Sequence, residues 1–155
     1  MSDMLVPLYK LPEHRSLLQK LSEGGIDVRR AIAPEKHKVT GWVREHFNER
    51  WADECEVAFA HIPVGCWIAV EKGELIGFAC YDSTCRGFFG PTGVSEAARG
   101  KGVGKGLLLA CLHAMHAEGY GYAVIGGVGP KEFYANAAGA IEIPDSTTGI
   151  YKGIL

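Results

Sequence analysis

Residues 90–106 read GPTGVSEAARGKGVGKG, a glycine-rich segment placed between an apolar strand pattern and an apolar helix pattern. The helix pattern runs from about Val103 to Glu118. The first N–H groups of a helix lack intrahelical partners, and the helix dipole adds partial positive charge there. Glycines allow a phosphate to approach those groups closely, and the same loop carries the cations Arg99, Lys101 and Lys105. The segment therefore predicts an anion site at a strand-to-helix junction.

Two common phosphate-binding motifs do not fit the spacing of these glycines. A P-loop needs glycine five residues before the Gly104-Lys105 pair and serine or threonine after it, where this sequence has Arg99 and Gly106. A dinucleotide fingerprint needs a third glycine at position 105 or 107, and those residues are Lys105 and Leu107. A turn without a ligand is the remaining alternative, but turns seldom need four alternating glycines and three cations.

The pattern that does fit is R-x-x-G-x-G, formed by Arg99, Gly100, Lys101, Gly102, Val103 and Gly104. With Val94 five residues upstream of the arginine, this segment resembles the acetyl-coenzyme A loop of the GCN5-related N-acetyltransferase (GNAT) family. The resemblance covers roughly residues 26–140. It implies that the loop from Arg99 to Lys105 binds the phosphates of acetyl-CoA. It also implies that the backbone of Thr92, Gly93 and Val94 meets the pantetheine arm and the thioester carbonyl.

Pro91 is unusual because it interrupts an otherwise apolar strand, and proline has no N–H for a strand ladder. Flanked by Gly90 and Gly93, it predicts a bulge or a parting of this strand from its neighbour. By the resemblance, the family opens its sheet at this strand and holds the cofactor in the gap. An edge strand with the proline facing water is the alternative, and the following helix disfavours it because a crossover needs strands on both sides.

The second match is the segment KEFYANAAGA at residues 131–140, which is similar to the closing segment of the family. By that resemblance Tyr134 is the candidate general acid that meets the departing thiolate. The alternative is a tyrosine that packs as a core aromatic. Three positions depart from the family pattern: Gly139 comes one residue late, Ala140 replaces an aromatic, and Gly127 stands where a cofactor-contacting asparagine is frequent.

Acetyl transfer to an amine also needs a base, because an alkyl amine carries a proton at neutral pH. Some family members carry a glutamate on the strand before the loop, but the strand expected at 87–94 has no carboxylate. Glu54, Glu56 and Asp82 stay open as bases, as does water. The missing strand carboxylate keeps an alternative function open, namely a non-catalytic acyl-CoA-binding sensor or interaction module.

Bulk properties indicate one domain spanning residues 1–155. The chain has a net charge of −2 and a pI of about 6.3, which favours neither nucleic acid nor an anionic membrane as a partner. No apolar run approaches the roughly 18–20 residues of a transmembrane helix, and no signal peptide is evident. The five cysteines lack a C-x-x-C pair, which favours buried free thiols in a reducing cytoplasm and disfavours a metal or disulfide framework.

The expected fold is α/β (α+β), a single acyl-CoA N-acyltransferase-like domain. Its mixed, mostly antiparallel sheet carries helices on both faces, and a parted strand pair holds the cofactor. Residues 1–25 form an N-terminal extension with a strand-like piece and a short helix. Residues 66–94 form an antiparallel meander, the helix from about 103 crosses over to a parallel strand at 122–125, and a short helix follows Pro130. The apolar residues of 150–155 favour a final strand.

The expected function is transfer of an acetyl group from acetyl-CoA to a primary amine by direct attack in a ternary complex. Small molecules and peptides are both open as acceptors, as are the length of the acyl chain and a homodimeric state. Most of the rate gain would come from holding the two reactants together.

Overall fold

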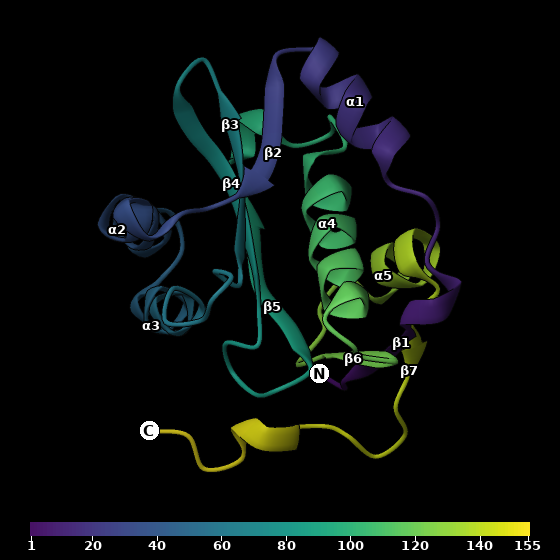
Figure 1. The fold of residues 1–155 in the computed structure, drawn as a ribbon. Helices are drawn as coiled ribbons and strands as arrows, with labels where there is room; N and C mark the ends of the chain where they lie inside the picture. The colour runs from purple at the N-terminus through teal and green to yellow at the C-terminus, as the bar shows by residue number, and fades with distance from the viewer.

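The computed structural model describes residues 1–155, and a seven-stranded sheet divides the molecule into layers (Figure 1). The strands lie in the order β2-β3-β4-β5-β6-β1-β7. Their bounds are β1 Met4–Pro7, β2 Ile26–Arg30, β3 Cys66–Glu71, β4 Glu74–Tyr81, β5 Phe88–Val94, β6 Tyr122–Ile125 and β7 Ile141–Glu142. Only β5 and β6 run parallel to each other; every other neighbouring pair is antiparallel. The prediction of a mixed, mostly antiparallel sheet is confirmed.

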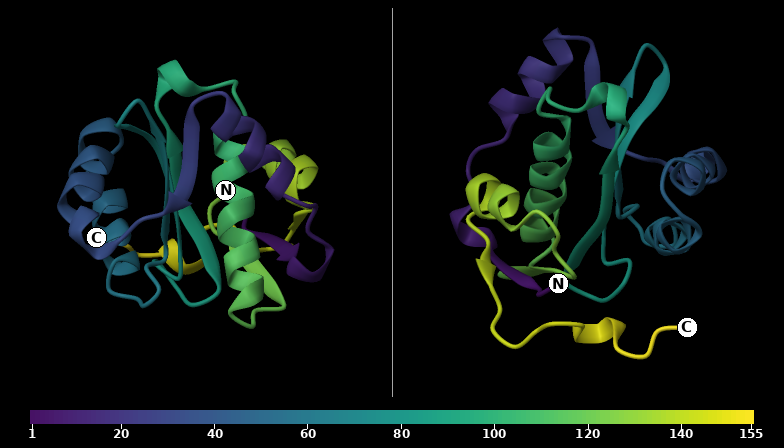
Figure 2. Two further views of the ribbon diagram at one scale, coloured as in Figure 1. Left: turned by 45° about the horizontal axis from the view of Figure 1, so that its top comes forward. Right: turned by 180° about the vertical axis from the view of Figure 1, so that it is seen from behind.

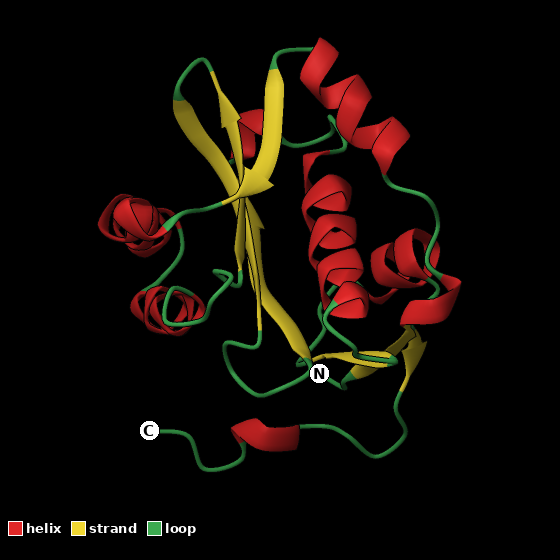
Figure 3. Cartoon of the chain, in the orientation of Figure 1, coloured by secondary structure: helices red, strands yellow, loops and turns green.

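Helices cover both faces of the sheet, as expected (Figures 2 and 3). Their bounds are α1 Arg15–Glu23, α2 Lys36–His46, α3 Glu49–Ala58, α4 Val103–Ala117 and α5 Lys131–Ala138. Helices α2 and α3 lie on one face, and α1, α4 and α5 lie on the other (Figure 1). Ten of the 15 residues of α4 are buried, because this helix packs between the sheet and the outer helices α1 and α5. Its nearly uniform apolar sequence is typical of a helix enclosed on all sides.

The meander of β3, β4 and β5 confirms the interpretation of residues 66–94. The turn between β3 and β4 is Lys72-Gly73, and both residues have positive φ, 51° and 76°. A two-residue hairpin with positive φ at both positions matches the twist of the strands, and glycine adopts this conformation without a steric cost.

The strand β5 changes partners along its length. On the β4 side the register shifts so that Ala79 faces Thr92 while Tyr81 faces Phe89. Gly90 and Pro91 therefore share one opposing residue, which is the bulge that the proline predicted. On the other side β5 pairs with β6 only at Phe88 and Phe89. Beyond Phe89 the two strands part, and β5 continues to Val94 with a partner on one side only.

The two ends of the chain lie in different places: the N-terminal strand lies beside β6, and the C-terminal residues lie near α3 (Figure 1). The strand β1 inserts between β6 and β7, so the segment expected as an N-terminal extension contributes to the central sheet. The expected final strand at 150–155 is wrong: a 3₁₀ helix spans Gly149–Tyr151, and no strand follows it. Positive φ at Thr148, Gly149 and Gly153 prevents an extended conformation. The segment instead runs across the lower end of the sheet toward α3 (Figure 1).

All five cysteines are free thiols, and four of them are buried, in agreement with the sequence interpretation. The longest helix, α4, has 15 residues, and no helix combines the length and apolar character needed to cross a membrane.

Candidate active site

The glycine-rich loop forms a tight turn into α4. Gly100 and Gly102 both have positive φ, 82° and 86°, and Gly102 is the N-cap residue of the helix. No side chain caps this end, so the N–H groups of Val103, Gly104 and Lys105 lack the partners that a cap supplies. Such an uncapped end is an anion-binding site by geometry and by the helix dipole.

The loop cations are available to an anion. The side chains of Arg99, Lys101 and Lys105 belong to exposed residues, and none of them forms a salt bridge. Arg99 makes one bond, in which its Nε donates to the carbonyl oxygen of Val94 at 3.3 Å. This bond ties the loop to the end of β5, so the cations and the parted strand share one surface.

The start of α4 approaches its neighbours closely at Gly104. A Cβ added at Gly104 would lie 3.8 Å from Val94 Cγ2 and 4.0 Å from Phe133 Cζ. Val94 ends β5 and Phe133 belongs to α5, so the glycine faces the space between these two elements. Because Gly104 has no side chain, the volume that a Cβ would fill stays free for the close approach of a ligand to the helix end.

Thr92, Gly93 and Val94 line the parted side of β5. They pair with Ala79, Phe78 and Gly77 of β4, and Thr92 Oγ1 also donates to the carbonyl of Phe78 at 3.1 Å. No strand occupies their other side, because pairing with β6 ends at Phe89. The three residues that the sequence assigned to the pantetheine arm thus lie where β5 is unpaired on that side, at the end nearest the loop.

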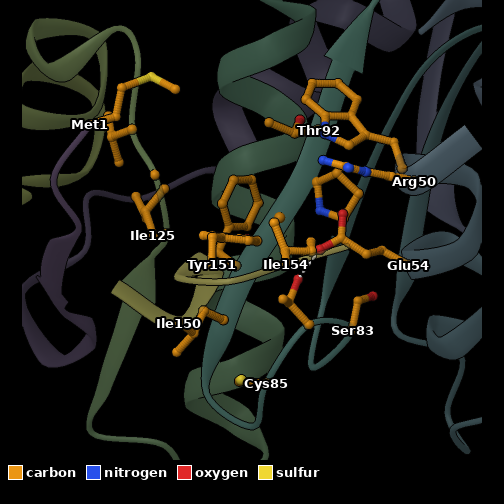
Figure 4. A pocket seen from close by; sticks show the side chains of 18 of the residues that line it. Met1, Arg50, Glu54, Ser83, Cys85, Thr92, Ile125, Ile150, Tyr151 and Ile154 are labelled. Atoms are coloured by element: carbon orange, nitrogen blue, oxygen red, sulfur yellow. Dashed lines mark hydrogen bonds between the residues drawn. The ribbon is translucent and has the colours of Figure 1, made fainter. Parts of the chain in front are cut away.

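A cavity of about 1650 Å³ opens at the other end of the parted strands. Its walls come from the bulge of β5, the helix α3, the loop after β6 and the C-terminal residues. Figure 4 shows labelled side chains from β5, α3 and the C-terminal residues around this cavity. The residues after β6 are glycine-rich, and the Asp3 carboxylate holds this loop by accepting the Gly127 N–H at 2.8 Å.

Tyr134 lies in the first turns of α5 and lines this cavity. It is 7% exposed, and its ring packs edge-on against Phe89 with centroids 6.4 Å apart. Burial alone raises the pKa of its hydroxyl, and no hydrogen bond within the chain contributes to that shift. A protonated hydroxyl without an internal partner is free to donate to a ligand. Gly139 is the C-cap residue of the helix with φ of 69°, a conformation that favours glycine.

The three carboxylates that stayed open as bases separate in space. Glu54 on α3 lines the cavity, whereas Glu56 and Asp82 do not. Asp82 instead accepts the Tyr120 hydroxyl at 2.9 Å. Thr84 Oγ1 donates to Glu54 Oε1 at 2.5 Å, which fixes this carboxylate beside the cavity. Two residues along a helix point in different directions, so Glu54 and Glu56 cannot share one wall.

Other wall residues were missed from the sequence. They include Met1, Trp51 and Asp53, with a group from the C-terminal residues. The only local signal for the C-terminal group was its apolar side chains, which the sequence interpretation assigned to a strand. Nothing in the local sequence pattern marks Met1 or Asp53 as part of this cavity.

A separate cluster of thiols lies in the core under α3. The Sγ atoms of Cys55, Cys66 and Cys80 lie within 4.8 Å of one another, and all three residues are 0% exposed. Burial raises the pKa of the Cys80 thiol well above its ordinary value. The cluster belongs to the apolar core and has no opening to the cavity.

Comparison with solved structures shows the same fold in other proteins. Three solved structures share the fold: a GCN5-related glucosamine N-acetyltransferase region of a fungal multi-domain GH3 beta-N-acetylglucosaminidase (TM-score 0.74, 13% identity), a GCN5-related N-acetyltransferase from Sphaerobacter thermophilus (0.67, 18%) and a GNAT family acetyltransferase from Brucella melitensis in complex with acetyl-CoA (0.55, 18%). They align with 92%, 92% and 70% of this chain, which spans 19%, 48% and 80% of theirs.

Sequence comparison matches this chain to a family profile but to no individual curated protein. A search of curated protein sequences gave no match. The profile of the Acetyltransferase (GNAT) family matches residues 36–137, which include the meander, the glycine-rich loop and most of α5. This chain therefore belongs to the GNAT acetyltransferase family.

Proposed function

We propose that this protein transfers an acetyl group from acetyl-CoA to a primary amine by direct attack in a ternary complex. One observation carries the proposal: the uncapped start of α4 adjoins the unpaired side of β5, and this strand leads to a cavity that contains Tyr134. The anion site, the unpaired side of β5 and the cavity thus follow one another along β5.

The loop residues Arg99, Gly100, Lys101, Gly102, Val103, Gly104 and Lys105 bind the phosphates in this proposal. The gap at Gly104 fits such a ligand, because a side chain there would fill the space beside the helix end. Thr92, Gly93 and Val94 form the strand segment that meets the pantetheine arm, and the backbone groups on its side away from β4 contact the arm. Backbone N–H groups of this kind also stabilise the oxyanion of the tetrahedral intermediate.

Two side chains handle protons in the proposed reaction. Glu54, directly or through water, takes the proton that the amine must lose before it attacks the thioester. Tyr134 donates its hydroxyl proton to the departing thiolate of CoA, and its raised pKa keeps that proton in place at neutral pH. The products are an amide and CoA with a free thiol.

A second function, acyl-CoA binding without catalysis, is favoured by one observation. The strand β5 carries no carboxylate, so every carboxylate in the cavity lining comes from α3. In that case the protein would bind acetyl-CoA and release no thiol in the presence of amines.

Thiol release decides between the two functions. Acetyl-CoA is incubated with the protein and a panel of primary amines, and free CoA thiol is measured against an amine-free control. The transferase predicts amine-dependent release. Calorimetric titration of CoA runs in parallel, and binding without release from any amine would support the non-catalytic function.

A further inference from the structure

The wall of the cavity formed by the chain end has no role in the proposed proton transfers. We name residues 147–155 the C-terminal segment. Six of its residues line the cavity: Thr148, Ile150, Tyr151, Lys152, Gly153 and Ile154. Figure 4 shows Tyr151 and Ile154 in the middle of the cavity near Glu54, with Ile150 farther from Glu54. The segment therefore faces the space that an acceptor must enter.

The C-terminal segment is held by side chains rather than by strand pairing. Its backbone N–H bonds stay internal, from Tyr151 to Thr148 and from Ile154 to Tyr151. The Tyr151 ring lies over the glycine loop, where a Cβ added at Gly127 would be 3.7 Å from its Cε2 atom. At the far end Arg50 Nη2 donates to the Leu155 carbonyl at 2.7 Å. These anchors hold the apolar side chains against the cavity.

The isoleucines of this wall are unusually exposed for apolar residues. Ile150 is 48% exposed and Ile154 is 55% exposed, although both line the cavity. Apolar surface left open to water in a cavity gains free energy when an apolar ligand covers it. The wall thus favours a ligand with an apolar surface of its own.

The opposite wall carries negative charge. Glu49 forms a salt bridge with Arg44, and the Arg50 guanidinium donates to the chain end. Asp53 and Glu54 are therefore the carboxylates of α3 that face the cavity without a cationic partner. Lys152 is the one further cationic side chain in the lining. This wall suits the ammonium group of an acceptor before it loses its proton.

We propose, resting on the transferase function above, that the acceptor is a primary amine attached to an apolar body. The amine lies toward Glu54, and Ile150 and Ile154 contact the apolar body. A polycation of similar length would place an additional ammonium group against the isoleucines, where it loses hydration without gaining a partner. The site therefore selects an arylalkylamine or alkylamine over a linear polyamine.

Two probe amines test the selection, 2-phenylethylamine and spermidine. In the wild type, kcat/KM for 2-phenylethylamine should be at least about tenfold higher than kcat/KM for spermidine. Contacts in an apolar pocket supply discrimination of this size. The double variant Ile150→Ser, Ile154→Ser should lose about tenfold for 2-phenylethylamine and leave spermidine and the KM for acetyl-CoA unchanged. Ile141→Ser is the matched control, because Ile141 is 60% exposed on β7 and lies outside the cavity.

Calorimetric titration of each amine into the CoA-bound protein gives a readout that needs no turnover. Weaker binding of 2-phenylethylamine to the double variant than to the wild type and the control supports the inference. Binding of this amine without thiol release would refute the transferase and keep the apolar amine site. Equal use of both amines, equal binding of both, or no effect of the double variant would overturn the inference.

Discussion

Replacing Gly104 with valine tests the cofactor loop while sparing the fold. The glycine is the second residue of α4 and its φ is not positive, so a side chain meets no backbone strain. An added Cβ makes ordinary contacts, the nearest with Val94 at 3.8 Å. Valine has a somewhat better helix propensity than glycine, by about 0.5 kcal/mol. The free energy of unfolding should therefore stay within about 0.5 kcal/mol of the wild type.

The effect on CoA affinity should be large by comparison. The valine methyl groups occupy the gap beside the helix end and keep a phosphate away from the N–H groups of Gly104 and Lys105. Hydrogen bonds to a charged partner contribute about 1.5–3 kcal/mol each, so losing two costs about 3–6 kcal/mol. Since about 1.4 kcal/mol is tenfold, the Kd for CoA should rise by about 10²- to 10⁴-fold.

Calorimetric titration of CoA measures this change, with urea unfolding as the check on stability. Gly41→Val is the matched control, because Gly41 also lies in a helix and an added Cβ there meets nothing within 4 Å. The control should bind CoA as the wild type does. Unchanged CoA affinity in Gly104→Val, with the control also unchanged, would refute the assignment of the phosphates to the start of α4.

Three further predictions concern single side chains. Tyr134→Phe should lower kcat by about 10²- to 10⁴-fold in steady-state kinetics and leave the thermal midpoint unchanged, because the hydroxyl makes no internal hydrogen bond. Glu54→Gln should lower kcat with little change in the Kd for CoA, whereas Glu56→Gln on the same helix should have no effect; equal activity of all three proteins would leave water as the base. Arg29 lowers the pKa of Glu35 from 4.5 to about 2, so this pair stabilises the fold above about pH 4.5 and the gain is lost as the pH falls toward 2. Urea unfolding at about pH 6 and about pH 3 measures this effect. Between these two pH values, the free energy of unfolding should fall less for Glu35→Gln than for the wild type.

The parts of the fold that the sequence predicted depend on local backbone chemistry. The two-residue turn after Glu71 needs positive φ, and a glycine marks it. The bulge in β5 follows from a proline that cannot donate to a ladder. The start of α4 follows from Gly102, where a positive φ reverses the chain before an apolar helix. Each of these signals lies within a few residues of the structure that it determines.

The cavity could not be predicted in the same way, because its walls come from segments far apart in the chain. Glu54 and Glu56 are equivalent in sequence, and only the packing of α3 against the sheet directs one of them into the cavity. The C-terminal segment has strand-like composition, but the positive φ of Thr148 breaks the extended path. Its apolar residues then cover a cavity rather than a neighbouring strand.

The first residues of the chain connect both halves of the candidate site. The Asp3 carboxylate accepts the N–H of Gly127 at 2.8 Å, and the carbonyl of Ser2 accepts the N–H of Val128 at 2.9 Å. These bonds fix the glycine loop that leads into α5 and so position Tyr134. The N–H of Asp3 donates to Ser146 Oγ at 2.8 Å, directly before the C-terminal segment begins. Because Asp3 is 8% exposed, its carboxylate depends on such partners. Asp3 thus holds both the glycine loop that leads to Tyr134 and the residue before the C-terminal segment, so the proposed general acid and the proposed acceptor wall share one anchor.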